Sequence, residues 1–227
     1  RQMCIRDSGR TGDEFSRIPY IHKLVNEIDL TAYRLLQYLD YDLEYEDIQS
    51  LKDSLLSRTF RFSPLQAVSG FDHPIHGIET DTTVQVDDVV LGALEQILKT
   101  ELVKYSYLSS SCYLSYQPHN SCSHCRDTIL GWKNLEGLCK LSFTHFKNNF
   151  SRARLIEKVR PIMKYDEDLM NLLSDACNMP VLYGHADVKL TYKNRIPSIP
   201  YLSDILFDLY LDLSLIHISE PTRRRGI

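Results

Sequence analysis

Hydrophobic residues recur three and four positions apart in several separate stretches of the chain, a spacing typical of helices with one buried face. The first stretch places Leu24, Ile28, Leu35 and Leu39 on one side of a helix. The same pattern predicts helices over Leu24–Leu39, Ile48–Leu56, Val89–Leu98, Cys122–Trp132, Arg154–Ile162 and Asp166–Cys177, and a closing helix from Ser203 through Leu213. Helices therefore dominate the predicted structure.

Strand patterns are shorter and fewer. Val188–Tyr192 alternates apolar and polar residues, which favours a strand. Leu65–Thr83 contains glycine and proline between short apolar runs, so we expect short strands and turns there. Leu138–Phe146 is a further candidate strand. The order of these elements predicts an α+β fold.

Composition fits a folded domain with a core of its own. Hydrophobic residues make up 43% of the 227 residues, and no apolar run approaches the roughly 20 residues that cross a bilayer. We therefore expect no membrane partner. Outside Cys4 the chain has five cysteines, and three of them fall within Cys112–Cys125. An odd number at irregular spacing is not typical of a disulfide framework, which favours a reducing compartment.

The two ends of the chain look foreign to the rest. RQMCIRDS at the start and SLIHISEPTRRRGI at the finish resemble translated sequencing-adapter read-through, so residues 1–8 and 214–227 are expected to be artefacts. Without them the chain keeps 21 basic and 28 acidic residues. A nucleic-acid-binding protein usually carries a basic face, so any such face here must be local.

The stretch Ile196–Leu211, IPSIPYLSDILFDLYL, is the most informative motif. It resembles the motif I-P-Q-G-x-x-L-S-P-L-L-x-N-I-Y-L of group II intron reverse transcriptases and maturases. Ser198 stands where that family has Gln, and Ile199 stands where it has Gly. The positions that agree are Ile196, Pro197, Leu202, Ser203, Leu206, Tyr210 and Leu211.

Four further blocks resemble the same family in the same order. Asp87–Leu98 is similar to D-[KR]-[IV]-V-Q-x-A-L-x-x-I-L, and Leu51–Pro64 is similar to a helix that leads into an aromatic-x-x-Pro turn. Ser115–Ile129 resembles G-F-R-P-x-R-S-x-x-x-A-I. Phe143–Phe150 falls where the family has G-D-I-K-x-C-F-D, and His145 occupies the position of the first catalytic aspartate.

The resemblance implies a reverse-transcriptase-like fingers and palm, helix-rich with a small antiparallel palm sheet. Residues 9–110 would form the fingers-like region and residues 111–213 a palm-like region that ends before the family's Y-x-D-D motif. The family would use Mg²⁺, which prefers carboxylate ligands that the imidazole of His145 does not replace. Ile199 also replaces a glycine that would let backbone approach a ligand. We expect a pseudoenzyme with no catalytic residues, no cofactor and no DNA synthesis, in which His145 lies beside Ser198 and Ile199.

By the same resemblance, the expected partner is structured group II intron RNA, which the protein would hold to assist splicing. Ribonucleoprotein subunits are possible further partners, and the expected location is an organelle, in particular the mitochondrion. Phosphate contacts need fixed positive charge, and surface charge without a ligand is the competing interpretation. The candidate RNA-binding residues are Arg58, Arg61, Lys147, Arg152 and Arg154.

Other acidic, cysteine and histidine clusters favour plainer interpretations. Cys122, His124 and Cys125 lack a second pair of ligands, so reduced thiols are expected there instead of zinc. Asp87–Asp88 and Asp166–Asp168 are expected to be helix N-terminal charge on a solvated surface. No metal site is predicted.

Two other functions remain open at this point. One is a fragment of an active RNA-directed DNA polymerase whose motifs are corrupted by a frameshift or by unusual codon use. The other is a non-catalytic structural domain of an organellar ribonucleoprotein, which the acidic balance of the chain favours. A carboxylate pair downstream of Leu213 would favour the polymerase, and a basic domain there would favour the maturase.

Overall fold

The structure is a computed structural model that describes residues 19–39, 41–68, 80–104, 131, 151–164, 166–183, 188–190, 196–207 and 209–210. The predicted loop and helix between residues 105 and 132, Gly131 apart, lie outside these residues. So do the predicted strand Leu138–Phe146 and both chain ends. Those predictions remain untested.

Five named helices occupy the stretches whose hydrophobic spacing predicted them. They are α1 (Tyr20–Tyr38), α2 (Tyr45–Leu56), α3 (Gln85–Lys104), α5 (Arg152–Ile162) and α6 (Glu167–Ala176). A short closing helix begins at Ser203. Local signals fix two of the starts: the side chains of Glu44 and Asp47 form a capping box at α2, and the side chain of Asp166 accepts a hydrogen bond from the backbone N–H of Leu169 at α6.

The sheet has four short strands in the order β2-β1-β3-β4. They are β1 (Leu65–Ala67), β2 (Thr80–Thr82), β3 (Val181–Tyr183) and β4 (Val188–Leu190). Strands β1 and β2 pair antiparallel, as do β3 and β4, but β1 and β3 run parallel. The sheet is therefore mixed, and the prediction of an antiparallel sheet was wrong. The sheet forms where β1 of the β1–β2 pair meets β3 of the β3–β4 pair. The chain between these two pairs is long, so no tight turn forces β1 and β3 to run antiparallel.

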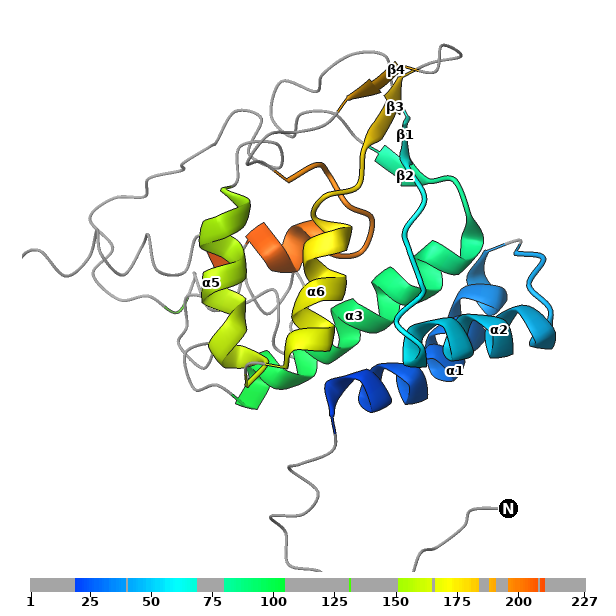
Figure 1. The fold of residues 1–227 in the computed structure, drawn as a ribbon, viewed down its shortest axis with the longest axis horizontal. Coiled ribbons are helices and arrows are strands. Elements are labelled where there is room, and N and C mark those ends of the chain that lie inside the picture. The colour runs from blue at the N-terminus through cyan, green and yellow to red at the C-terminus, as the bar shows by residue number, and fades with distance from the viewer. Residues whose placement is uncertain are drawn as a thin grey trace, which may run out of the picture.

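The elements surround α3, which crosses the middle of the molecule (Figure 1). Helices α1 and α2 lie on one side of α3, α5 and α6 lie on the other, and the sheet forms one end. Leu91, Leu94 and Leu98 of α3 are fully or almost fully buried. Strands from both of the predicted regions share the one sheet, while the predicted boundary at residues 110 and 111 lies outside the described part of the chain.

None of the helices in the described part of the chain combines the length and the apolar character that crossing a membrane requires.

Candidate functional site

The turn at Ser198–Ile199 is held firmly in the core of the molecule. Both residues are buried, and only 1% of Ile199 is exposed. The backbone N–H of Ile199 donates to Oγ of Ser203 at 2.6 Å, and the same hydroxyl donates to the carbonyl oxygen of Ile199 at 2.8 Å. The hydroxyl of Thr80 in β2 donates to the carbonyl oxygen of Ser198. Main chain and side chains together therefore fix this turn against the end of the sheet.

A polar cleft of about 360 Å³ opens beside this turn. Its acidic side chains are Glu95, which pairs with Lys99 at 2.7 Å, and Asp204. Hydroxyl groups supply most of the other polar atoms that it presents. The lining residues are Thr80, Glu95, Ser198, Ile199, Pro200, Tyr201, Ser203 and Asp204. Among the described residues, those that line the cleft carry carboxylates and hydroxyls but no basic side chain.

Asp87 and Asp88 begin α3, but they do not lie on a solvated surface as predicted. Their exposed fractions are 2% and 4%. The backbone N–H of Ser63 donates to Oδ2 of Asp87 at 2.9 Å, and the hydroxyl of Tyr41 donates to Oδ2 of Asp88. Burial raises the pKa of both carboxyl groups, although these hydrogen bonds lower it. The expectation of solvation was wrong because loop residues from elsewhere in the chain cover this helix start.

Tyr41, Asp88 and Tyr201 form a cluster that links three separate parts of the chain. Burial raises the pKa of Tyr41, and Asp88 and Tyr201, both hydrogen-bonded to it, raise it further. Burial also raises the pKa of Tyr201. This Tyr41–Asp88–Tyr201 cluster joins the loop before α2 to the start of α3 and to the residues after Ile199. These hydrogen-bonded, partly or fully buried side chains hold the turn at Ser198–Ile199 in place.

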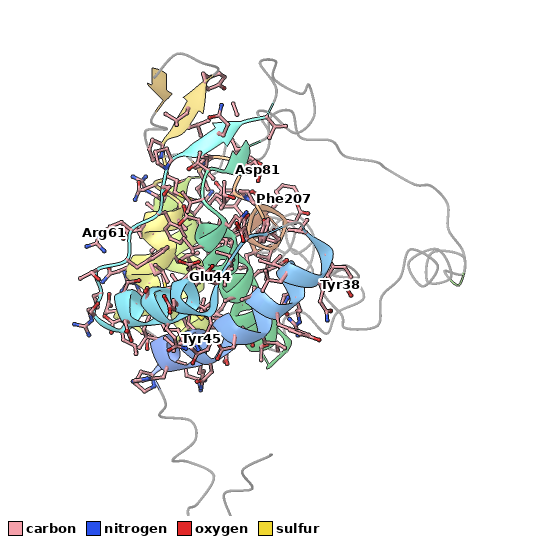
Figure 2. All side chains as sticks on the ribbon, turned by 90° about the vertical axis from the view of Figure 1, so that its right-hand side faces the viewer. Tyr38, Glu44, Tyr45, Arg61, Asp81 and Phe207 are labelled. Carbon is pink, nitrogen blue, oxygen red and sulfur yellow. The ribbon has the colours of Figure 1, made fainter. Side chains whose placement is uncertain are left out.

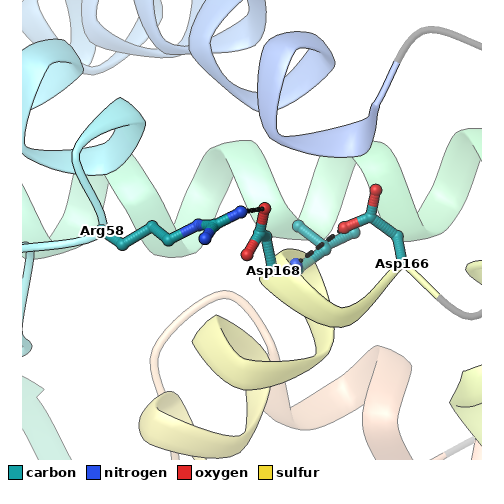
Figure 3. A network of polar contacts seen from close by, with 4 residues as sticks. Arg58, Asp166 and Asp168 are labelled. Carbon is teal, nitrogen blue, oxygen red and sulfur yellow. Dashed lines mark hydrogen bonds and ion pairs between the residues drawn. The ribbon is translucent and has the colours of Figure 1, made fainter.

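Arg58 and Arg61, two of the predicted RNA-binding residues, lie together in the segment after α2. Arg58 has a left-handed backbone with φ of 62°, and its Nη2 donates to Oδ2 of Asp168 at 2.7 Å (Figure 3). Nη1 of Arg61 donates to the carbonyl oxygens of Arg58 and Phe60. The two arginines line a groove of about 300 Å³ together with Ile21, Leu55, Phe60, Asp168, Asn171, Leu172 and Asp175. We call it the Arg58–Arg61 groove.

Arg152 and Arg154, two further predicted RNA-binding residues, are not among the residues that line this groove. Arg152 begins α5, and its charge acts on Cys177 just beyond the end of α6, whereas Arg58 pairs with Asp168 in the first turn of α6. A helix of this length spans about 15 Å, so the two arginines lie near opposite ends of α6. Arg154 is exposed on α5. Lys147 lies outside the described residues.

His145 also lies outside the described residues, so its predicted place beside Ser198 and Ile199 stays a prediction. In the described part of the chain, no three histidine, cysteine, aspartate or glutamate side chains gather as a metal site would require. Sequence analysis did not predict the buried cluster around Asp88, because its partners Tyr41 and Tyr201 lie more than forty residues from it along the chain. Tyr41 stands within an acidic stretch, and nothing in its neighbours signals burial.

Neither models of known protein families nor curated proteins match this chain. The fold and the site thus define a helix-rich α+β domain in which a buried turn is held between a mixed sheet and a carboxylate–tyrosine cluster.

Proposed function

We propose that this chain is a degenerate, maturase-like reverse transcriptase domain that holds structured group II intron RNA to assist splicing, without synthesising DNA. The turn at Ser198–Ile199 carries the proposal. Its sequence resembles the family's I-P-Q-G motif, and its main chain is bonded to β2 and to the start of the next helix. Such anchoring is expected of a scaffold that is retained for a structural purpose.

The same turn supports the proposal that the chain has lost catalytic activity. The side chain of Ile199 fills space in the core, where a glycine would leave backbone open to a ligand. Carboxylates line the neighbouring cleft, and they repel the phosphates of a nucleotide unless metal ions intervene. Asp88 also stands at the second position of the D-[KR] motif, so an acidic group replaces a basic one there. We infer that nucleotide addition is absent.

The Arg58–Arg61 groove is the proposed contact for RNA phosphates. The side chain of Arg58 is 72% exposed, and exposed ion pairs stabilise a protein by only about 0–1 kcal/mol. A phosphate can therefore displace Asp168 at little cost in free energy. Arg61 keeps its guanidinium at the edge of the molecule (Figure 2). An exposed guanidinium that can donate to two phosphate oxygens at once suits phosphate binding.

RNA binding is tested by fluorescence anisotropy with a labelled, structured fragment of a group II intron at 50 and 300 mM salt. We expect binding that fades with salt, because phosphate contacts release counterions. Arg58→Ala/Arg61→Ala should weaken it by about tenfold, at roughly 1.4 kcal/mol per factor of ten. The matched control Arg34→Ala/Lys99→Ala removes the same charge from α1 and α3, and it should have a much smaller effect. Equal losses in both pairs would contradict a localised contact.

Catalysis is tested by primer extension with Mg²⁺ or Mn²⁺. We expect no extension by the chain, and none after His145→Asp, because Ser198 and Ile199 also depart from the motif and such defects act as a unit. Template-dependent extension by the unmodified protein would support the alternative of an active polymerase.

A structural subunit of an organellar ribonucleoprotein is the second candidate function. The excess of acidic over basic residues favours it, since overall charge does not attract RNA. Absence of RNA binding at 50 mM salt would decide for this role. Both proposals place the protein in a mitochondrion. Imaging of the tagged full-length protein in its own cells would test this location.

A further inference from the structure

The outward side of α1 exposes an unusual amount of apolar surface. Helix α1 packs its inner side on α3 and α2, where Leu24 and Ile28 are fully buried. Large apolar side chains nevertheless face outward along its second half and at its end. Their exposed fractions are 45% for Leu30, 61% for Tyr33, 41% for Leu36, 82% for Tyr38 and 41% for Leu39. Leu30, Tyr33 and Leu36 follow one another at three-residue spacing, so they are neighbours on the helix surface. Exposed apolar side chains that lie together in this way often mark an interaction site.

Acidic side chains border this surface. Asp42, Glu44, Glu46 and Asp47 are all exposed, and Tyr45 among them is 76% exposed. Arg34 is exposed next to Tyr33, and the sequence has no other lysine or arginine between Leu30 and Lys52. Figure 2 shows Tyr38, Glu44 and Tyr45 on the face turned to the viewer, with Arg61 at the edge opposite Tyr38. We call the exposed apolar and acidic residues between Leu30 and Asp47 the acidic–aromatic surface, which leaves out Arg34.

The charge of this surface decides which partner fits it. RNA is excluded because its phosphates would meet four carboxylates. A second copy related by two-fold symmetry would place the same carboxylates against each other, which is repulsive. A partner with lysine or arginine next to aliphatic side chains complements both features, since its cations reach the carboxylates and the faces of the tyrosines.

We propose that the acidic–aromatic surface is a docking site for a basic, amphipathic segment of a partner protein. Exposed tyrosines supply rigid contact area at a low entropic cost, and the carboxylates select the positive charge of the partner. The site is independent of the Arg58–Arg61 groove, because α2 begins at Tyr45 and ends before Arg58. A helix of twelve residues separates the two surfaces by about 18 Å. RNA and a basic protein can therefore bind at the same time.

The test uses the full chain and a fluorescein-labelled amphipathic peptide of lysine and leucine, with binding followed by fluorescence anisotropy. A peptide with glutamate in place of lysine is the negative control. Asp42→Asn/Glu46→Gln removes two charges and leaves the capping box of Glu44 and Asp47 intact. Tyr38→Ser/Tyr45→Ser removes the aromatic contacts. We expect the lysine peptide alone to bind, and each double variant to lose about tenfold or more in affinity.

A matched control distinguishes the effect of this surface on peptide affinity from the effect of overall net charge. Glu157→Gln/Glu167→Gln removes two exposed carboxylates from α5 and α6, and it should leave peptide affinity within about twofold, since distant surface charges are screened. Circular dichroism verifies that every variant is folded. Equal loss in this control, no binding of the lysine peptide, or dimerisation of the chain through Tyr38 and Tyr45 in sedimentation experiments would each overturn the proposal.

Discussion

At the scale of single residues, burial keeps Cys177 in its protonated form. The side chain is fully buried, and burial raises the pKa of its thiol to about 12 even though the charge of Arg152 opposes this. Only a thiolate reacts with alkylating reagents at an appreciable rate. Cys177 therefore behaves as a small apolar residue that packs behind α5 and α6.

We expect Cys177 to resist N-ethylmaleimide in the folded protein at pH 8 and to react only after unfolding. Peptide mapping by mass spectrometry after labelling pulses in increasing urea measures this. The midpoint of its labelling curve should coincide with the loss of helical circular dichroism. Labelling of Cys177 in the absence of urea, at the rate of an unfolded peptide, would contradict its burial.

Asp88 makes stability depend on pH. Its pKa in the folded protein lies above the ordinary aspartate value of 3.8, because burial disfavours the ionised form. The folded state thus binds protons more tightly than the unfolded state, and the free energy of unfolding falls as pH rises through the folded pKa. Asp88→Asn still accepts a hydrogen bond from Tyr41 but carries no charge.

We therefore expect the free energy of unfolding of Asp88→Asn, relative to that of the wild type, to be higher at pH 8 than at pH 4. Urea denaturation at both pH values gives the two differences in free energy. Asp53→Asn, at an exposed site on α2, is the matched control for removing one carboxylate. A constant difference across this range would show that Asp88 is not responsible.

At the scale of elements, Gly92 of α3 lies tightly against Thr31 of α1. A Cβ atom at that position would lie 2.9 Å from Cγ2 of Thr31. Alanine is normally about 1 kcal/mol better than glycine within a helix. Here the contact with a buried, β-branched side chain outweighs that preference, because overpacking of a tight interface typically costs about 1–3 kcal/mol.

Gly92→Ala should therefore destabilise the protein, and Thr31→Ser in the same chain should restore part of the loss by removing the methyl group. A double-mutant cycle from urea denaturation measures the coupling. We expect the alanine at position 92 to be less harmful in the Thr31→Ser background than in the wild type. Additive effects would mean that the helices can separate freely at this point.

The helices were predictable because each carries its own signal in the sequence. Hydrophobic spacing located α1, α2, α3, α5 and α6, and Asp166 was expected to favour the start of α6. The sheet depends on partners that are distant along the chain. Strand β3 has only three residues and no alternation to detect, and its parallel pairing with β1 has no local signal.

The candidate site was predictable only in part. The motif resemblance pointed to Ser198 and Ile199, but not to the hydroxyl of Thr80 that holds the turn. Arg58 and Arg61 were predicted as candidate contacts for RNA phosphates, whereas the ion pair of Arg58 with Asp168 could be found only from the fold. The burial of Asp88 depends on a tyrosine that precedes it by 47 residues, which composition and periodicity do not reveal.

At the scale of the whole molecule, stability is concentrated around α3. Leu91, Leu94 and Leu98 in its middle are buried, whereas β4 lies at the edge of the sheet in the described part of the chain and pairs there with β3. Hydrogen exchange followed by NMR should show the slowest amides in the middle of α3, at rates that report global unfolding. Amides of Val188–Leu190 should exchange sooner through local opening. Equal protection in both elements would indicate that the sheet end and the helices unfold together.

The parallel pairing of β1 with β3 has a consequence for synthesis on the ribosome. Leu65 pairs with Val181, more than a hundred residues later. At 5–20 residues per second, the edge of β1 waits roughly 6–23 s for its partner. During that interval α1, α2 and α3 can already pack, but an unpaired strand edge remains available to other nascent chains. Aggregation during expression is therefore expected to begin at this edge, and a chaperone that covers it would raise the yield of folded protein.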